Sequence, residues 1–425
     1  MNSAPAPAAS ERRPTDWAGP VMQARIRRRY AAERRFKLLG LASLVFSAAF
    51  LAFLLVTMLG NGLRGFTQTE IRVPIDFARS SLMIDPAQLK GFGADQALAG
   101  ADIEGTAAKA ADLAFGDGGA RLLSDGAWLT LRDEIKAKPE ILTGKADLWL
   151  PAATGIDLAA KGKASAEDTA RYNTLKQAGV VRTGFNATFL TGSDGTDPTI
   201  VGIWGAFKGS LITMLITLVL AFPIGVLSAL YLEEYAPRNR WTDLIEVSIN
   251  NLAAVPSIIF GLLGLAVFLN TFHMPRSAPI VGGLTLALMT MPVIVIAGRN
   301  AIKSVPPSIR DAALGIGASR VQVVFHHVLP LALPGILTGT IIGMARALGE
   351  TAPLLMIGMR AFIAAPPGGF TDPATVLPVQ IFLWSDEVSR GFVEKTSAAI
   401  IVLLVFLLAM NGLAIYLRNK FETRW

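Results

Sequence analysis

The sequence predicts an all-α polytopic membrane protein with about six transmembrane helices and an α+β insert after the first helix. Charged residues make up only 17% and hydrophobic residues 52% of the 425 residues, whereas soluble domains carry about a quarter charged residues. The apolar residues are also gathered into runs of about 20 or more, long enough to cross a hydrocarbon core about 30 Å thick.

The first span is expected at 38–63, behind a basic segment. Residues 1–37 are interpreted as a largely disordered cytoplasmic N-terminus, because 1–20 are rich in Ala and Pro. The basic cluster directly precedes an apolar run, so the positive-inside rule explains it better than nucleic-acid binding, and contact with membrane lipid is an added expectation. The run is too long for a signal-peptide core and is expected to remain as an anchor. The cluster consists of Arg25, Arg27, Arg28, Arg29, Arg34, Arg35 and Lys37.

Residues 64–206 form a polar segment of domain size, which the topology places in the periplasm. TQTEIRVPID (67–76) alternates like a strand, and WLTLRDEIKAK (128–138) has a helical pattern. GSDGTDP (192–198) is rich in turn residues. The segment is therefore expected to be an α+β domain. It shows no catalytic constellation, so the expected role is interaction or spacing.

Five further spans are expected in a core at 207–417, near 207–232, 247–270, 279–298, 331–358 and 396–417. The segment after the first of these carries Arg238 and Arg240, the loop at 299–330 is basic, and so is the tail at 418–425. These basic segments alternate with less basic ones as six spans with both termini in the cytoplasm require.

Several kinds of chemistry are excluded or disfavoured by the residues present. The chain has no cysteine, so thiol catalysis and cysteine metal sites are excluded, and its three histidines show no metal-ligand spacing. No G-x-x-x-x-G-K-[ST] occurs, so the chain lacks the loop that cradles nucleotide phosphates. The chain itself is therefore expected to bind no nucleotide and to hold no cofactor.

The loop at 299–330 contains the most informative motif, within SVPPSIRDAALGIGASRVQVVFHHVLP (304–330). Pro306 and Pro307 should end the preceding helix, and Ser308 is expected to cap a short helix running to Gly315. Gly317 suits a left-handed turn. The sequence thus predicts a short helix outside the bilayer, fastened by prolines at both ends.

This motif resembles the EAA motif of ABC importer permeases. The matching residues are Asp311, Ala312, Ala313, Gly317, Leu329 and Pro330. Two positions depart from it, since Asp311 stands where Glu is usual and His327 where Ile is usual. The resemblance implies that the short helix couples the chain to an ATPase.

The segments at 231–268 and 333–355 are similar to the phosphate transport permeases of the PstA family, and the resemblance covers about 189–417. It implies the type I ABC importer fold, a bacterial inner membrane and inorganic phosphate as substrate. It also implies a PstB-like ATPase dimer that binds ATP and Mg²⁺, a PstC-like second permease and a PstS-like periplasmic binding protein. Many relatives carry an Arg and a Glu at the end of the fourth span, where this chain has Ile296 and Arg299.

Three alternatives remain open at this stage. The chain could be an ABC permease for another oxyanion, such as molybdate, sulfate or phosphonate. It could instead be a membrane-anchored periplasmic sensor, although neither terminus is long enough to hold a signalling output. A secondary transporter is disfavoured because the spans show no internal repeat.

MARALGETAP (344–353) places Arg346 and Glu350 in an apolar run. With 100° per residue, both charges should share a face with Gly339 and its glycine neighbours and point into the bundle. A charge in mid-membrane costs roughly 2.5–3.5 kcal/mol, so another interaction must offset this cost. Either the pair merely fastens helices, or Arg346 meets the anion in transit while Glu350 positions it.

Overall fold

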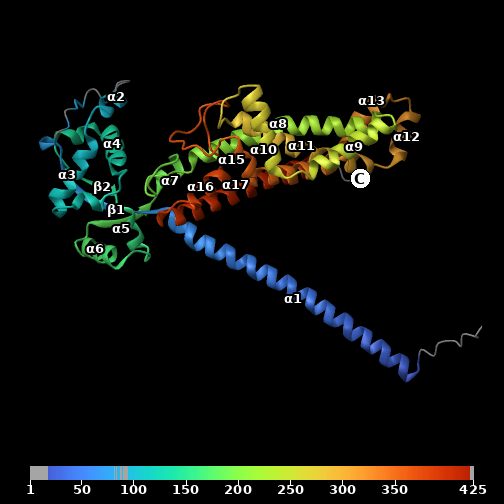
Figure 1. The fold of residues 1–425 in the computed structure, drawn as a ribbon, viewed down its shortest axis with the longest axis horizontal. Helices are drawn as coiled ribbons and strands as arrows, with labels where there is room; N and C mark the ends of the chain where they lie inside the picture. The colour runs from blue at the N-terminus through green and yellow to red at the C-terminus, as the bar shows by residue number, and fades with distance from the viewer. Residues whose placement is uncertain (1–17, 81, 83, 87–88, 90–93, 422–425) are drawn as a thin grey trace, which may run out of the picture. The chain divides into compact units, whose positions relative to one another are not determined.

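The computed structural model describes residues 18–80, 82, 84–86, 89 and 94–421. Figure 1 shows the order of the elements along the chain. The chain divides into two compact units, residues 1–58 and 59–425, and each is described by itself.

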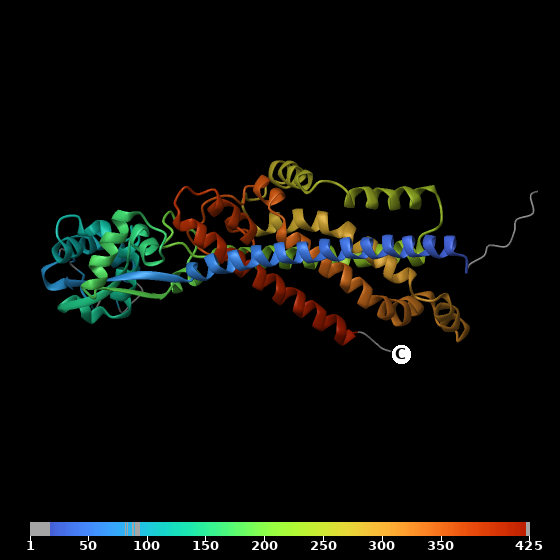
Figure 2. The same ribbon diagram turned by 90° about the horizontal axis from the view of Figure 1, so that it is seen from below.

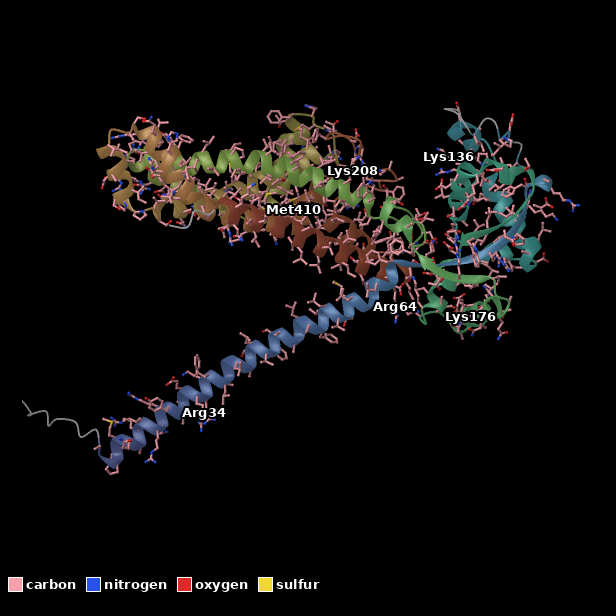
Figure 3. The ribbon with its side chains drawn as sticks, turned by 180° about the vertical axis from the view of Figure 1, so that it is seen from behind. Arg34, Arg64, Lys136, Lys176, Lys208 and Met410 are labelled. Carbon is pink, nitrogen blue, oxygen red and sulfur yellow. The ribbon has the colours of Figure 1, made fainter. Side chains whose placement is uncertain are left out.

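The first unit is the greater part of α1 (Pro20–Gly65), a 46-residue helix. Its apolar stretch is the predicted first span. The basic residues before this stretch, among which Figure 3 labels Arg34, are helical as well. The expectation of disorder is therefore wrong for 20–37. Arg, Lys, Ala and Glu favour helix, and Lys37 bonds Glu33 one turn away at 2.6 Å, so nothing ends the helix there. The remainder of the predicted disordered tail, 1–17, lies outside the described residues.

An antiparallel sheet of three strands in the order β2-β1-β3 organises the insert. The central strand β1 (Thr67–Asp76) pairs on one side with β2 (Lys145–Pro151) and on the other with β3 (Val181–Phe185). Because side chains alternate along a strand, Ile71, Val73 and Ile75 all reach the core of the insert. The predicted strand and the α+β character are confirmed.

Helices complete the insert core, where Leu131 and Ile135 of α4 (Ala127–Ala137) are fully buried. This helix is the one predicted at 128–138. The domain end at 206 stays a prediction, and Phe189, which precedes it, belongs to the core cluster of the bundle. The other elements are η1 (Phe77–Arg79), α2 (Ala94–Ala99), α3 (Ile103–Phe115), η3 (Gly119–Leu122), η4 (Pro139–Thr143), α5 (Thr154–Ala160), α6 (Ala166–Gln177) and α7 (Ala187–Thr191).

The remaining elements form a helical bundle, in which α8 (Trp204–Leu230), α11 (Pro279–Lys303) and α14 (Leu329–Gly349) pack on one another. Figures 1 and 2 show α12 and α13 at the end of this bundle away from the insert. The other elements are η5 (Tyr231–Tyr235), α9 (Arg240–Ala253), α10 (Ser257–Gly264), η6 (Leu265–Thr271), α12 (Pro307–Gly315), α13 (Arg320–Val323), η7 (Val324–Val328), α15 (Ala352–Met356), α16 (Leu377–Ser385) and α17 (Gly391–Phe421).

Within the described residues, five helices are long and apolar enough to cross a membrane, or six if one bent pair counts as a span. The bent pair is α9 with α10 and η6, and it turns by 101°. The span expected near 247–270 corresponds to this bent pair. Pro256 holds ψ at 136° just before α10, and a proline cannot donate the backbone hydrogen bond that would continue the helix.

Small residues allow α14 to lie close against α11. A side chain on Gly335 would meet Ala301, one on Gly339 would meet Ala297, and one on Gly343 would meet Thr290. Glycines spaced by four let two helix backbones approach closely, as the sequence predicted for this stripe.

Candidate functional site

The short helix predicted outside the bilayer is α12, and it links α11 to the segment that leads into α14. Pro307 occupies its first turn, where the missing N–H is no loss. Gly317 has φ +91°, so the expected left-handed turn is present. Leu329 and Pro330 begin α14, as the sequence indicated.

The predicted cap of α12 is wrong. Pro306, not Ser308, is the N-cap residue, and no side chain caps the helix. The fixed φ of Pro306 and Pro307 starts the helix two residues earlier. A full capping box lies instead at the start of α13, where Ser319 and Gln322 bond each other's backbone N–H groups. The pattern S-x-x-Q signals this box and was overlooked in the sequence.

The coupling segment, 306–328, leaves apolar side chains uncovered. Ile316 is 83% exposed and Val321 57% exposed, and Asp311 and Ala312 are exposed beside them. Ala313 is buried and fastens α12 to the bundle. Exposed apolar residues at the end of α12 and in α13, in the same short segment as an exposed acidic residue, suit a protein partner more than water.

Arg310 ties α12 to two spans. Its guanidinium donates to the Glu234 carboxylate at 2.7 and 3.1 Å, and to the carbonyl oxygens of Val305 at 2.6 Å and Ile302 at 3.0 Å. Glu234 lies in η5, a π-helical turn that ends α8. The position of α12 is therefore fixed to the ends of both α8 and α11. The acidic pair in YLEEY, at the end of an apolar run, was the sequence signal for this anchor.

Arg299, the departure noted in the sequence, is held in the same region. Its side chain is 10% exposed, and it pairs with Glu233 and with Glu246, the latter at 2.7 Å. Lys303 lies 3.5 Å from Glu233. Two carboxylates occupy Nε and Nη2 of this guanidinium, so Arg299 ties η5, α9 and α11 together.

Replacing Arg299 by Gln should lower the stability of the permease by on the order of 3 kcal/mol, because it leaves the largely enclosed Glu233 carboxylate without its main partner. Thermal unfolding in detergent measures this. Lys303→Gln is the matched control, since Lys303 is 55% exposed and reaches the same carboxylate; its effect should stay below about 1 kcal/mol. Adding Glu233→Gln to Arg299→Gln should recover most of the loss. Unchanged stability with altered anion selectivity would assign Arg299 to the substrate instead.

Arg346 and Glu350 form a pair, but not in mid-helix. Arg346 Nε lies 3.4 Å from Glu350 Oε1, and α14 ends at Gly349, so Glu350 is the C-cap residue in an extended conformation. The Arg346 side chain is 46% exposed and that of Glu350 is 17% exposed. The expectation that Arg346 points into the bundle of its own chain is wrong.

The drift of the helical repeat explains this difference. Steps of four residues advance about 400°, so a stripe with that spacing turns by about 40° at every step. The stripe that begins at Gly339 and Gly343 accordingly continues to Ala347, which is fully buried. Arg346 lies about 100° away from Ala347, and its side chain is exposed among the residues that the structure describes.

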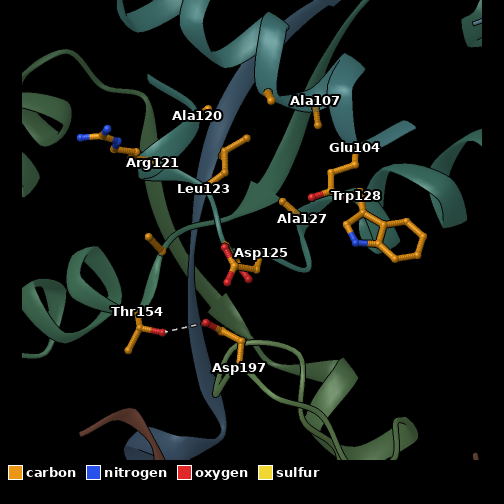
Figure 4. Close-up of a pocket in the computed structure, with 13 residues that line it drawn as sticks. Glu104, Ala107, Ala120, Arg121, Leu123, Asp125, Ala127, Trp128, Thr154 and Asp197 are labelled. Atoms are coloured by element: carbon orange, nitrogen blue, oxygen red, sulfur yellow. Dashed lines mark hydrogen bonds between the residues drawn. The ribbon is translucent and has the colours of Figure 1, made fainter. Parts of the chain in front are cut away.

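The insert contains an open cleft of about 450 Å³ between α3, η3 and α4 (Figure 4). Its lining includes the carboxylates of Glu104, Asp125 and Asp197 against the single guanidinium of Arg121. An acidic lining repels anions, so the cleft does not suit an oxyanion. Nor do the described residues contain a group of His, Asp or Glu able to hold a metal ion.

Two family models match the chain. One is described as a binding-protein-dependent transport system inner membrane component and matches residues 221–423. The other is described as a domain of unknown function, DUF3333, and matches residues 23–170, which covers α1 and most of the insert.

Several known permeases are similar to part of the chain. The chain is 32% identical over 242 residues to the probable ABC transporter permease protein YqgI of Bacillus subtilis, covering 52% of this chain and 80% of that protein. It is 30% identical over 214 residues to the phosphate transport system permease protein PstA of Yersinia pestis, covering 50% and 71%. It is 35% identical over 156 residues to PstA 1 of Mycobacterium tuberculosis, and there it spans about half of the relative, 51%.

Similar solved structures include a MetNI methionine ABC transporter in an inward-facing conformation, with 16% identity and a TM-score of 0.39 over 52% of this chain and 95% of that one. A bacterial alginate ABC transporter has 17% identity and a TM-score of 0.40 over 52% and 80%. Likeness at this level carries no information about a substrate.

Proposed function

Because this chain belongs to the family of binding-protein-dependent transport system inner membrane components, a multi-pass permease family that works with an ATPase and a binding protein, we propose that it conducts inorganic phosphate through the inner membrane. It is a non-catalytic subunit, and ATP hydrolysis belongs to its partner. The relatives named PstA support phosphate as the substrate. Membership of this family argues against the alternative of a membrane-anchored periplasmic sensor.

The observation that carries the proposal is the coupling segment. It combines a short proline-started helix, the left-handed turn at Gly317 and exposed apolar side chains such as Ile316. Asp311 and Ala312 provide the polar and small contacts, Ala313 packs into the bundle, and Leu329 and Pro330 begin α14 directly after the segment. An ATPase subunit is the partner that such a surface fits in this family.

Arg346 and Glu350 are the proposed substrate residues. The guanidinium offers several donors in a fixed fork that suits an oxyanion, and it lies on an exposed side of α14 in the part of the chain that the structure describes. A second permease subunit, similar to PstC, is proposed to close that side, so that the pair faces a passage between two chains. Glu350 keeps the site weak enough for the anion to leave.

The proposed complex also contains a PstB-like ATPase dimer and a PstS-like phosphate-binding protein. The insert lies on the periplasmic side in this proposal, both termini are cytoplasmic, and the coupling segment is cytoplasmic. The basic residues flanking the spans support this orientation.

Uptake of radiolabelled phosphate should be inhibited by excess unlabelled phosphate but hardly by equal excesses of sulfate or molybdate. Right-side-out vesicles containing the chain with its co-purified partners are the material, and mass spectrometry of the co-purified chains identifies those partners. Stronger inhibition by sulfate, molybdate or a phosphonate would identify that oxyanion as the substrate and leave the permease assignment intact.

A further inference from the structure

The insert, most of which falls in the domain of unknown function, meets the bundle through buried charges rather than through a flexible linker. Glu394, in the first turn of α17, is almost fully buried. Lys161 Nζ lies 3.0 Å from its Oε2, and Lys163 Nζ lies 3.3 Å from its Oε1. Both lysines belong to the insert, at the end of α5 and just after it.

The insert side of this contact is itself fixed. Lys161 is 6% exposed, pairs with Asp157 Oδ2 at 2.7 Å and donates to the carbonyl oxygen of Thr67 at 3.1 Å. The other oxygen of Asp157 accepts from the backbone N–H of Thr69 at 2.8 Å. Lys161 thus joins α5, β1 and α17 through a single ammonium group.

The neighbouring residue of α17 holds the end of α1. Lys395 is 4% exposed and donates to the carbonyl oxygen of Gly65 at 3.0 Å, with its ammonium 5.2 Å from the ring of Phe189. Gly65 leaves no space for a side chain, since a Cβ there would lie 2.6 Å from the carbonyl oxygen of Glu394. The first turn of α17 is therefore enclosed by the insert on one side and by the last turn of α1 on the other.

We infer that Asp157, Lys161, Lys163, Glu394 and Lys395 form a latch that makes the insert a fixed extension of α17, so that insert and span move as one body during transport. Buried charges hold this geometry because separating them would leave ammonium and carboxylate groups without partners. A module that docked and undocked would need an interface that water can re-enter easily, and Lys161 and Glu394 offer none. Whatever binds the insert therefore acts directly on the last span.

A reversible cross-link tests whether the insert leaves α17. The chain contains no cysteine, and a Cβ on Gly391 of α17 would lie 3.0 Å from Thr154 Cγ2 of α5, within reach of a disulfide. Pro198 lies 2.8 Å from the same point, so Pro198→Gly is included in the variant and in its control. Thr154→Cys with Gly391→Cys then gives one disulfide that a reductant opens.

Oxidised and reduced samples of this cross-linked permease should take up phosphate at rates within twofold of each other. A loss of more than tenfold on oxidation, restored by reduction, would show that the insert must separate from α17 and would overturn the inference. The control carrying only Pro198→Gly should respond to neither treatment.

Breaking the latch provides the second arm. Glu394→Gln should raise amide hydrogen exchange at 154–163 and lower uptake at least fivefold, and the oxidised disulfide should restore both. Arg182→Gln is the matched control, because the Arg182–Glu70 pair lies within the insert sheet and does not touch α17. Unchanged exchange in Glu394→Gln, or exchange restored without uptake, would each contradict the latch.

The inference rests on the permease family and not on phosphate. If the wild-type complex takes up no phosphate, the proposed substrate fails, while the exchange arm still measures the latch. ATPase activity of the assembled transporter then replaces uptake as the activity readout.

Discussion

Phosphate uptake should be abolished when Arg346→Gln and Glu350→Gln are combined, while the permease remains folded and bound to its ATPase. The double variant removes both charges together, so neither is left unpaired. Arg346 is 46% exposed within the chain and the pair distance is 3.4 Å, so the pair contributes at most about 1 kcal/mol to folding. The loss of uptake follows because the fork of donors that suits an oxyanion is gone.

The measurement is phosphate uptake alongside the yield and thermal stability of the co-purified complex. Lys37→Gln with Glu33→Gln removes an exposed ion pair of the same i, i+4 spacing, 2.6 Å long, and should leave uptake unchanged. Near-normal uptake in the Arg346 and Glu350 double variant would instead make the pair a fastening between helices, as the other interpretation of the sequence holds.

Gly317→Val should detach the permease from its ATPase. Gly317 has φ +91°, a conformation that costs an L-residue about 1–2 kcal/mol and a β-branched one more. A Cβ there meets nothing within 4 Å, so the whole effect comes from the backbone. The strain should turn α12 and the exposed residues after it away from their observed orientation, and weaken ATPase association roughly 5- to 30-fold. Co-purification at graded ATPase concentrations measures the change.

Two controls separate backbone strain from a changed surface. Gly315→Val places the same side chain two residues away, also in open space but without a positive φ, and should bind the ATPase normally. Gly317→Asn should bind better than Gly317→Val, because Asn adopts the left-handed conformation most readily after Gly. Wild-type association of Gly317→Val would remove the turn from the docking surface.

The elements that follow from local patterns were predictable. Alternation in TQTEIRVPID fixes β1, the two prolines at 306 and 307 place α12 after a break, and a glycine at 317 requires its left-handed turn. Each of these depends on residues within a few positions, so the sequence contains the whole cause.

The features that depend on packing between separate parts of the chain were not predicted. Arg346 was expected on the glycine face because it lies seven residues, nearly two helical turns, after Gly339. The residues that pack against α11 are instead spaced by four, and this spacing leads from Gly339 and Gly343 to Ala347. The latch was missed for another reason. No local pattern marks Glu394 as buried, and only the fold brings Lys161 to it across more than two hundred residues.

The close contact of α14 with α11 makes the two spans move as one rigid body. With no room between Gly339 and Ala297, or between Gly343 and Thr290, neither helix can slide past the other without first parting from it. The helix α12 adjoins one end of this helix pair, and Arg346 lies near the opposite end, in the last turn of α14. A helix of 21 residues is about 32 Å long. A tilt of about 10° imposed at α12 therefore displaces the guanidinium by about 5 Å, which is more than the length of a hydrogen bond.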